Sequence, residues 1–278
     1  MNATAYYDGP DLHATVFAAI RAAGRDVDEI DSDDLAGMDE FHALGRAGTI
    51  ALAELAGVTS GQRVLDIGAG IGGPARTLAR HDGPSVTAVE PTERFANLAR
   101  TLTERAGLSE RVRIVHANGS GLPFAAASFD LVWTQSVWQS VEHKRALAGE
   151  IRRVLHVRGR LALFEIVGDG RDLHFFPVPW GDGPADSFVP AEPDMKAVLE
   201  QSGLHAEKWL VGERVQHALA AAAADVERMT SGLPGVGVDL LMPDYAERMA
   251  GLARNVEDGR VSLLLAVLSR RPRSQRTA

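Results

Sequence analysis

The chain has 278 residues, of which 45% are hydrophobic and 24% charged, with a formal net charge of −8 and no cysteine. This composition is ordinary for a globular protein with a sizeable core, and the absence of cysteine excludes disulfides, thiolate zinc sites and cysteine nucleophiles. The negative charge disfavours DNA or RNA as a partner, because it would repel a phosphate backbone. We see no signal-peptide pattern and no apolar run of membrane-spanning length, so we expect a cytoplasmic protein with no membrane partner.

The N-terminal part of the chain is expected to be helical. Residues 12–23 have apolar positions at helical spacing and are followed by Gly24, a typical helix terminator. A second helical pattern covers residues 40–56 and ends at Gly57. We expect these helices to cover the mouth of a binding site.

From residue 63 onward, short apolar runs alternate with helical patterns. Strands are expected over residues 63–67, 85–89, 112–116, 129–133 and 160–167, and helices over 73–80, 92–106 and 144–155. Alternation of this kind is typical of a parallel sheet with helices on both faces.

Residues 168–193 are rich in Gly, Pro and Asp, and loops of this length are often active-site lids. The remaining elements are expected to be helices over 194–202, 213–229 and 245–255 and strands over 205–211 and 260–269. No change in composition marks a second domain. We therefore expect a single domain over residues 1–278, with lid elements at about 1–56, 168–193 and 212–258.

The strongest chemical signal is the glycine-rich turn after the first expected strand. Gly68, Gly70 and Gly73 satisfy G-x-G-x-x-G, the dinucleotide fingerprint. Asp66, two residues before the first glycine, argues against a dinucleotide because its carboxylate would repel a pyrophosphate and favour a cation. S-adenosylmethionine, which carries an ammonium and a sulfonium and no phosphate, fits this turn better.

A second acidic residue, Glu90, ends the next expected strand, 22 positions after Gly68. A carboxylate there can accept hydrogen bonds from both ribose hydroxyls, and Pro91 could lie against an adenine. Both features fit NAD as well, so they do not discriminate between the two cofactors.

The segment Ala117-Asn118-Gly119-Ser120-Gly121-Leu122-Pro123-Phe124, followed by Phe129-Asp130, resembles the class I S-adenosylmethionine-dependent methyltransferases. Their usual pattern here is Gly-Asp-Ala, two variable residues and Leu-Pro-Phe, and their acidic residue accepts a hydrogen bond from the adenine amino group. Asn118 keeps a carbonyl acceptor but adds a donor, and Ala117 replaces the usual glycine. These departures weaken the expected adenine contact, not the resemblance.

Further segments resemble the branch that includes sarcosine and dimethylglycine N-methyltransferases and many natural-product enzymes. They are residues 39–42, 45–46, 70–76, 133–135, 177–180 and 255–260. The resemblance implies a Rossmann-like α/β fold: a seven-stranded, mostly parallel sheet with helices on both faces, an antiparallel last strand and a helical lid. The cofactor S-adenosyl-L-methionine would contact Arg46, Asp66, Gly68, Ala69, Gly70, Glu90, Pro91, Asn118, Gly119, Ser120 and Gln135. Arg46 could pair with its carboxylate, although a helix-surface arginine is an equal alternative.

Methyl transfer requires alignment of the acceptor with the methyl carbon and, for a hydroxyl or ammonium acceptor, removal of a proton. His42, His143 and Glu165 are the candidate bases. The candidate acceptor-binding residues are Trp138, Gln139, Phe176, Trp180 and Met242. The aromatic residues among them could hold an apolar or cationic substrate, although core packing is the more common role of any one of them.

We therefore expect methyl transfer to an O, N or C atom of a small-molecule metabolite, with natural-product biosynthesis as a candidate setting. A methyltransferase fold that catalyses a cyclisation or isomerisation is the main alternative, and a non-catalytic binding protein or an NAD-dependent oxidoreductase is a weaker one. No metal site is expected. The sequence leaves open the acceptor, the base and whether the protein is a homodimer.

Overall fold

The computed structural model describes residues 11–80, 82–218 and 232–270. Its helices are α1 (Leu12–Ala22), α2 (Gly45–Ala56), α3 (Gly73–Ala79), α4 (Glu93–Arg105), α5 (Lys144–Val154), α6 (Glu192–Gln201) and α8 (Tyr245–Glu257). Its strands are β1 (Arg63–Ile67), β2 (Ser85–Glu90), β3 (Val112–His116), β4 (Phe129–Gln135), β5 (Leu155–Gly168), β6 (Leu204–Val211) and β7 (Val261–Arg270). Three short 3₁₀ helices cover Trp138–Ser140, Pro184–Asp186 and Val238–Leu240.

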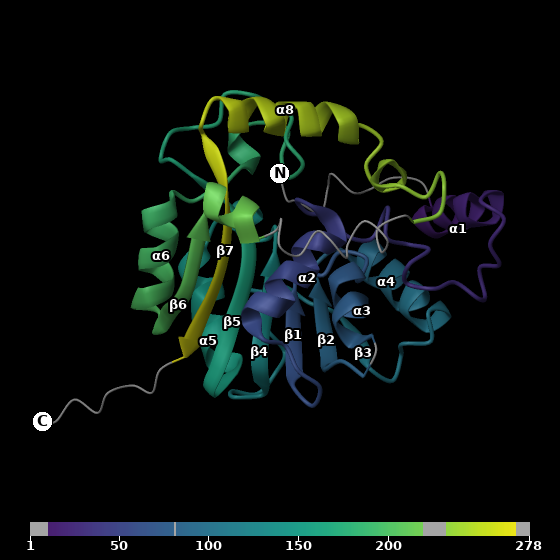
Figure 1. The fold of residues 1–278 in the computed structure, drawn as a ribbon, viewed down its shortest axis with the longest axis horizontal. Helices are drawn as coiled ribbons and strands as arrows, with labels where there is room; N and C mark the ends of the chain where they lie inside the picture. The colour runs from purple at the N-terminus through teal and green to yellow at the C-terminus, as the bar shows by residue number, and fades with distance from the viewer. Residues whose placement is uncertain (1–10, 81, 219–231, 271–278) are drawn as a thin grey trace, which may run out of the picture.

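The strands form one 7-stranded sheet in the order β3-β2-β1-β4-β5-β7-β6 (Figure 1). Strands β1 to β5 pair in parallel, whereas β7 is antiparallel to both β5 and β6. The predicted Rossmann-like sheet and the antiparallel insertion of the last strand are therefore confirmed.

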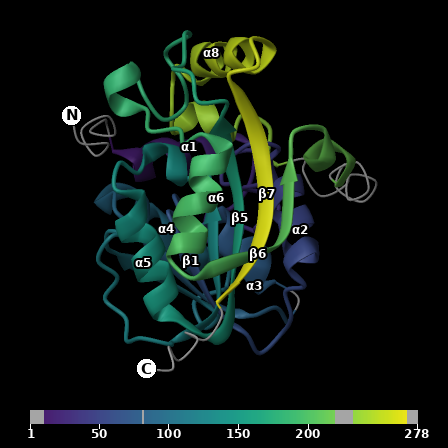
Figure 2. The ribbon, with the colours of Figure 1, turned by 90° about the vertical axis from the view of Figure 1, so that its left-hand side faces the viewer.

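Two helical layers cover the sheet, one on each face (Figure 2). Residues of α2, α3 and α4 pack in a core with Val64, whereas residues of α5 and α6 pack in a second core with Leu65 and Ile67. This division follows from the alternation of side chains along β1. Asp66 points to the same side of β1 as Val64. Because it lies at the end of the strand, its carboxylate reaches the edge where the parallel strands finish.

The predicted helix over residues 40–56 is wrong at its start. Helix α2 begins at Gly45, because Leu44 and Gly45 have left-handed φ angles of 68° and 51° that a continuous helix cannot accommodate. The preceding residues run irregularly across the carboxyl ends of the strands. The strand expected over 160–167 begins earlier, at Leu155. Part of the helix expected over 213–229 lies outside the described residues.

Helix α8 lies across the end of the molecule where the parallel strands finish (Figures 1 and 2). Its Asn255 amide accepts a hydrogen bond from the backbone N–H of His174 at 3.1 Å and donates one to the carbonyl of Phe175 at 2.8 Å. Arg248 donates to the carbonyl of Val178 at 2.8 Å. These bonds fasten the loop after β5 beneath α8, so the two segments form one cover.

Gly251 allows close contact within this cover, because a Cβ atom there would lie 2.1 Å from the carbonyl oxygen of Pro177. We expect Gly251→Ala to separate α8 from the loop and to lower the free energy of unfolding by about 1–3 kcal/mol, measured by chemical denaturation. Gly149→Ala in α5 is the control, since no atom lies within 4 Å of its Cβ position and alanine favours helix. Equal destabilisation by both changes would contradict this packing role.

Candidate active site

A cavity of about 1290 Å³ lies at the carboxyl ends of the parallel strands, beneath α8 and the loop after β5. The segment before α2 and the residues that follow β1, β2, β3 and β4 form its floor and walls. Ligands of open α/β sheets bind at this edge, because the connections there leave a crevice. Of the eleven predicted cofactor contacts, ten line the cavity: Asp66, Gly68, Ala69, Gly70, Glu90, Pro91, Asn118, Gly119, Ser120 and Gln135.

The glycine turn after β1 is held against the end of β2. The backbone N–H groups of Gly68 and Ala69 both donate to the carbonyl of Val89, at 2.8 and 3.0 Å. Gly68 has a φ of 75°, and a Cβ atom there would lie 2.6 Å from a methyl group of Val137. A side chain at this position would therefore push apart the turn and the loop after β4, so the fold requires glycine.

Asp66 is the buried acid of this site. Its side chain lines the cavity with 2% of the residue exposed, and Oδ2 has no hydrogen-bond partner among the described residues. Burial, followed by the charges of Glu40 and Glu90, raises the pKa of Asp66 to about 8. A buried carboxyl without a partner is unfavourable. A cation that entered the cavity would offset this cost.

Glu90 and Asn118 stand at the ends of β2 and β3. Glu90 accepts hydrogen bonds from the backbone N–H groups of Gly70 at 2.9 Å and Thr92 at 2.8 Å. Burial raises its carboxyl pKa, although these hydrogen bonds oppose the shift. Asn118 Oδ1 accepts from the N–H of Ser120 at 2.9 Å. Both side chains therefore shape their own loops and also line the cavity.

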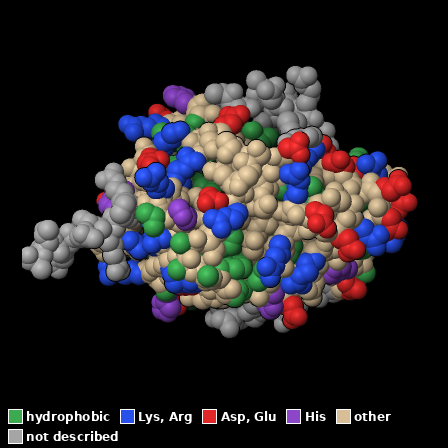
Figure 3. Space-filling model, turned by 90° about the horizontal axis from the view of Figure 1, so that it is seen from below, with side chains coloured by type: hydrophobic (Ala, Val, Ile, Leu, Met, Phe, Trp, Pro, Cys, Tyr) green, Lys and Arg blue, Asp and Glu red, His purple; other side chains and the backbone are tan. Residues whose placement is uncertain are grey.

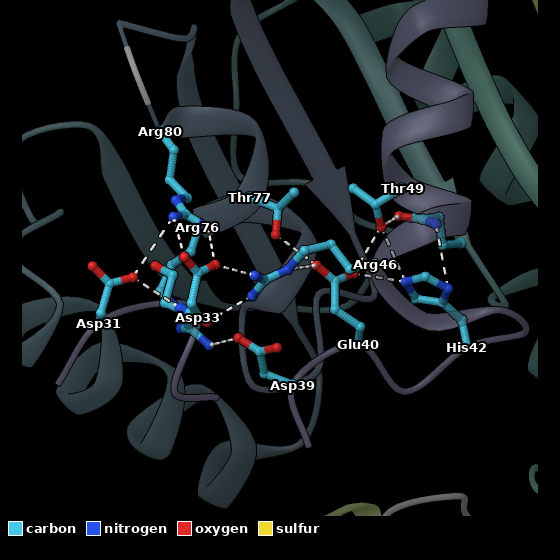
Figure 4. A network of polar contacts seen from close by, with 12 residues as sticks. Asp31, Asp33, Asp39, Glu40, His42, Arg46, Thr49, Arg76, Thr77 and Arg80 are labelled. Carbon is cyan, nitrogen blue, oxygen red and sulfur yellow. Dashed lines mark hydrogen bonds and ion pairs between the residues drawn. The ribbon is translucent and has the colours of Figure 1, made fainter. Parts of the chain in front are cut away.

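A polar network joins the segment before α2 to the ends of β4 and α3 (Figure 4). Glu40 accepts from Thr49 at 2.7 Å and from Thr77 at 2.6 Å, and its Oε2 lies 2.9 Å from Nε2 of His42. Gln135 Oε1 lies 3.0 Å from the same hydroxyl oxygen of Thr49 and accepts from the indole N–H of Trp133 at 2.6 Å. Burial alone would raise the pKa of Glu40, but the hydrogen bond and the charge of His42, followed by the hydrogen bonds from Thr77 and Thr49, outweigh it and hold this pKa below its usual value.

Arg46 does not line the cavity, so the predicted contact with the cofactor carboxylate is not supported. Its guanidinium is buried, bonds to Asp33 and donates to the carbonyl of Ser32 at 2.6 Å. Glu40 lies 3.7 Å from its Nε. Figure 4 shows Arg46 between these acidic groups. The structure therefore gives Arg46 a role in holding the N-terminal segment together.

The three candidate bases occupy different places. His42 lines the cavity, with 3% of its side chain exposed. His143 precedes α5 on the exposed surface and does not line the cavity. Glu165 is buried beneath the cavity floor, where it accepts from the backbone N–H groups of Val137 at 2.8 Å and Trp138 at 3.1 Å. Burial raises the pKa of Glu165 to about 7 against these hydrogen bonds. Glu165 positions the loop after β4.

Only some of the five candidate acceptor-binding residues line the cavity. Gln139 and Trp180 line the cavity, whereas Trp138, Phe176 and Met242 do not. Trp138 is fully buried in the core with α5 and α6, where Nε1 donates to Thr134 at 3.2 Å. Met242 is 1% exposed. For these two residues, core packing is the correct interpretation.

Several cavity residues were missed by the sequence analysis. They include Glu40, Phe41, Phe188, Tyr245 and Met249. Glu40 and Phe41 lie within residues 39–42, a segment that carried part of the family resemblance. Because His42 in the same segment was already a candidate base, the sequence contained a signal that could have identified both residues. Tyr245 and Met249 lie four positions apart on α8. Only the placement of α8 over the cavity identifies them.

Comparison with known proteins indicates a methyltransferase domain. Residues 65–163 match the family model for a methyltransferase domain, Methyltransf_11. The chain is 34% identical over 137 residues to the methyltransferase GfsG of Streptomyces halstedii, covering 49% of each chain. It is 32% identical over 100 residues to the sarcosine/dimethylglycine N-methyltransferase of Aphanothece halophytica, covering 36% of each. The chain thus spans half or less of the length of these relatives.

The fold is similar to that of the [4+2]-cyclase SpnF, with a TM-score of 0.61 and 21% identity over 80% of this chain and 79% of that one. Residues 65–163 thus match a methyltransferase domain, and they include the glycine turn and the ends of β2 and β4 that line the cavity. In sequence this part of the chain is similar to natural-product and sarcosine/dimethylglycine methyltransferases.

Within the described residues, no helix is both long and apolar enough to cross a membrane. The same residues contain no group of three or more His, Asp or Glu side chains arranged to hold a metal ion.

Proposed function

We propose that this protein is an S-adenosyl-L-methionine-dependent methyltransferase that acts on an O, N or C atom of a small metabolite in a biosynthetic pathway. The observation that carries the proposal is the buried carboxyl of Asp66 beside the glycine turn, whose Oδ2 has no hydrogen-bond partner in the described part of the chain. An ammonium at the methionine end of the cofactor would supply its missing partner. Glu90 and Asn118 would then face the ribose and the adenine, while Gly68 and Gly70 permit close approach.

The cofactor supplies a methyl group on a sulfonium, which leaves as a neutral thioether when the acceptor takes the methyl. The protein must exclude water and align the acceptor. Here the cover of α8 and the loop after β5 would close the cavity, and Gln135 would stand where cofactor and acceptor meet. We propose the whole chain as one domain with this lid. A cytoplasmic location and a homodimer stay predictions.

His42 is the candidate base that this arrangement favours. It lines the cavity, and Glu40 at 2.9 Å would stabilise its imidazolium after proton uptake. With an acceptor that must lose a proton, we expect His42→Gln to slow methyl transfer by about 10-fold, less than the loss of a full general base because water can also take the proton. S-adenosylhomocysteine affinity should change little. An unchanged rate with such an acceptor would assign His42 a structural role.

Calorimetric titration tests the cofactor assignment. Wild-type protein should bind S-adenosylhomocysteine, and folded Glu90→Gln protein should bind it more weakly because the ribose hydroxyls lose a charged acceptor. Preferential binding of NADH, with no binding of S-adenosylhomocysteine by folded wild type, would refute the proposal.

A non-methylating reaction is the second candidate, because a cyclase shares this fold and a fold does not fix the chemistry. Product mass distinguishes the two. Methylation adds one methylene unit to the acceptor, whereas a cyclisation or isomerisation leaves its mass unchanged and does not consume S-adenosylmethionine.

A further inference from the structure

The cavity wall carries acidic side chains and, among the described residues, no lysine or arginine. Its carboxylates are Asp39, Glu40, Asp66, Glu90, Glu142, Asp182 and Asp186. The opposite end of the molecule differs, since positive and negative side chains are interspersed there (Figure 3). The cavity therefore opposes the entry of an anionic acceptor such as a phosphate ester or a carboxylic acid.

Most of these carboxylates already have a role. Asp39 pairs with Arg76 at 3.0 Å, Glu40 with His42, and Asp182 with Arg248. Asp66 and Glu90 face the proposed cofactor position. Glu142, on the loop after β4, and Asp186, on the loop beneath α8, remain. Neither forms an ion pair with any residue in the described part of the chain.

Gln139 is a second, independent sign of a ligand in this part of the cavity. It lines the wall and is 2% exposed, yet its side-chain oxygen has no hydrogen-bond partner among the described residues. Its backbone carbonyl accepts from Phe188 at 2.8 Å, which joins the loop of Glu142 to the loop of Asp186. A buried carbonyl oxygen needs a donor, and a ligand N–H group would provide one.

The nearby cation Lys144 does not satisfy these acceptors. Its Nζ donates to the backbone carbonyls of Val141 at 2.7 Å and Phe188 at 2.5 Å, and its side chain does not line the cavity. Burial lowers its pKa to about 8. Lys144 therefore ties the two loops together and leaves the cavity wall acidic.

Aromatic rings also line the cavity. Phe41 and Tyr245 meet edge to face with their centroids 5.9 Å apart, and Trp180 and Phe188 also line the cavity. The indole N–H of Trp180 donates to Ser187 at 2.9 Å, which fixes the ring on the loop. Rings of this kind attract a cation through their faces and also accept an apolar skeleton.

From these observations we infer that the methyl acceptor is an apolar molecule with a protonated amine, which binds between Glu142, Asp186 and Gln139 with its skeleton against the aromatic wall. This inference rests on the proposed function, because it names the substrate class of that site. The amine is a recognition group, and the inference does not depend on which atom receives the methyl.

Binding of three probes with one carbon skeleton, phenylbutylamine, phenylbutanol and phenylbutyrate, tests the inference. Each is titrated into full-length protein with and without S-adenosylhomocysteine. The amine is expected to bind at least about 10-fold more tightly than the alcohol, with the acid weakest, since close charge pairs commonly contribute this much. Equal or tighter binding of the alcohol or the acid would overturn the inference.

Variants locate the amine. Glu142→Gln combined with Asp186→Asn should weaken amine binding about 10-fold and leave the alcohol unchanged, whereas Glu110→Gln, on the surface before β3, is the matched control. Unchanged amine affinity in the double variant would refute the site. Binding of S-adenosylhomocysteine, measured in the same samples, tests the proposed function separately, because the probes are also titrated without it.

Discussion

Asp66→Asn is expected to weaken the binding of S-adenosylmethionine and S-adenosylhomocysteine roughly 10- to 100-fold, the usual loss for a hydrogen bond to a charged group. Asparagine keeps the size and one acceptor of Asp66 but cannot carry the negative charge that an ammonium requires. Calorimetry measures the change. Asp130→Asn is the matched control, because Asp130 lies near the other end of the sheet and bonds to Arg63 at 2.9 Å. Its substitution should leave cofactor affinity unchanged.

The same variant should be more stable than wild type without cofactor. Because the pKa of Asp66 is raised to about 8 in the folded protein from 3.8, the unfolded chain binds fewer protons between these values and stability falls as pH rises. The asparagine side chain of the variant cannot ionise. The fall in the free energy of unfolding that Asp66 causes as pH rises should therefore be absent from the variant, as measured by urea denaturation from pH 5 to 8. A less stable variant that binds cofactor normally would show that Asp66 is only a structural residue.

Cofactor binding should also depend on pH through Asp66. A bound ammonium favours the ionised carboxylate, so binding below about pH 8 releases a proton. Affinity should therefore rise between pH 6 and 8 in wild type and rise less in Asp66→Asn. Titration in buffers of different ionisation enthalpy measures the released proton directly.

Glu40→Ala is expected to lower the free energy of unfolding by about 3–5 kcal/mol, the usual effect of removing one partner from a buried charged network. Thr49, Thr77 and His42 would each lose a hydrogen bond, and Arg46 would lose a neighbouring charge at 3.7 Å. Urea denaturation at neutral pH measures the loss. Glu54→Ala on α2 is the control, because Glu54 is exposed and surface changes are usually within about 0.5 kcal/mol.

The contribution of this network to the free energy of unfolding depends on pH in a defined direction. The pKa of Glu40 is lowered in the folded protein, so its contribution to stability is present above the unfolded pKa and is lost as pH falls through the folded pKa. Glu40→Gln, which keeps the size of the side chain, should therefore lose less stability than wild type on acidification. An identical acid profile in both proteins would contradict the assigned role of Glu40.

The sequence by itself determined the sheet and the cofactor edge. Short apolar runs alternating with helices specify a parallel sheet, and the carboxyl ends of such strands must meet at one edge. Asp66 and Glu90 lie at strand ends and Gly68 follows one, so their meeting at the cavity could be predicted from local pattern, whereas Asn118 was added by the family resemblance.

Tertiary structure decided the roles of residues outside this framework. Arg46, Trp138 and Met242 have side chains that suit either a site or a core, and only long-range packing buried them away from the cavity. The start of α2 was likewise set by the left-handed backbone at Leu44, which side-chain periodicity does not encode. The acidic acceptor region depends on the loop after β5 folding beneath α8. These segments are far apart in sequence and are joined by contacts such as Arg248 to Val178.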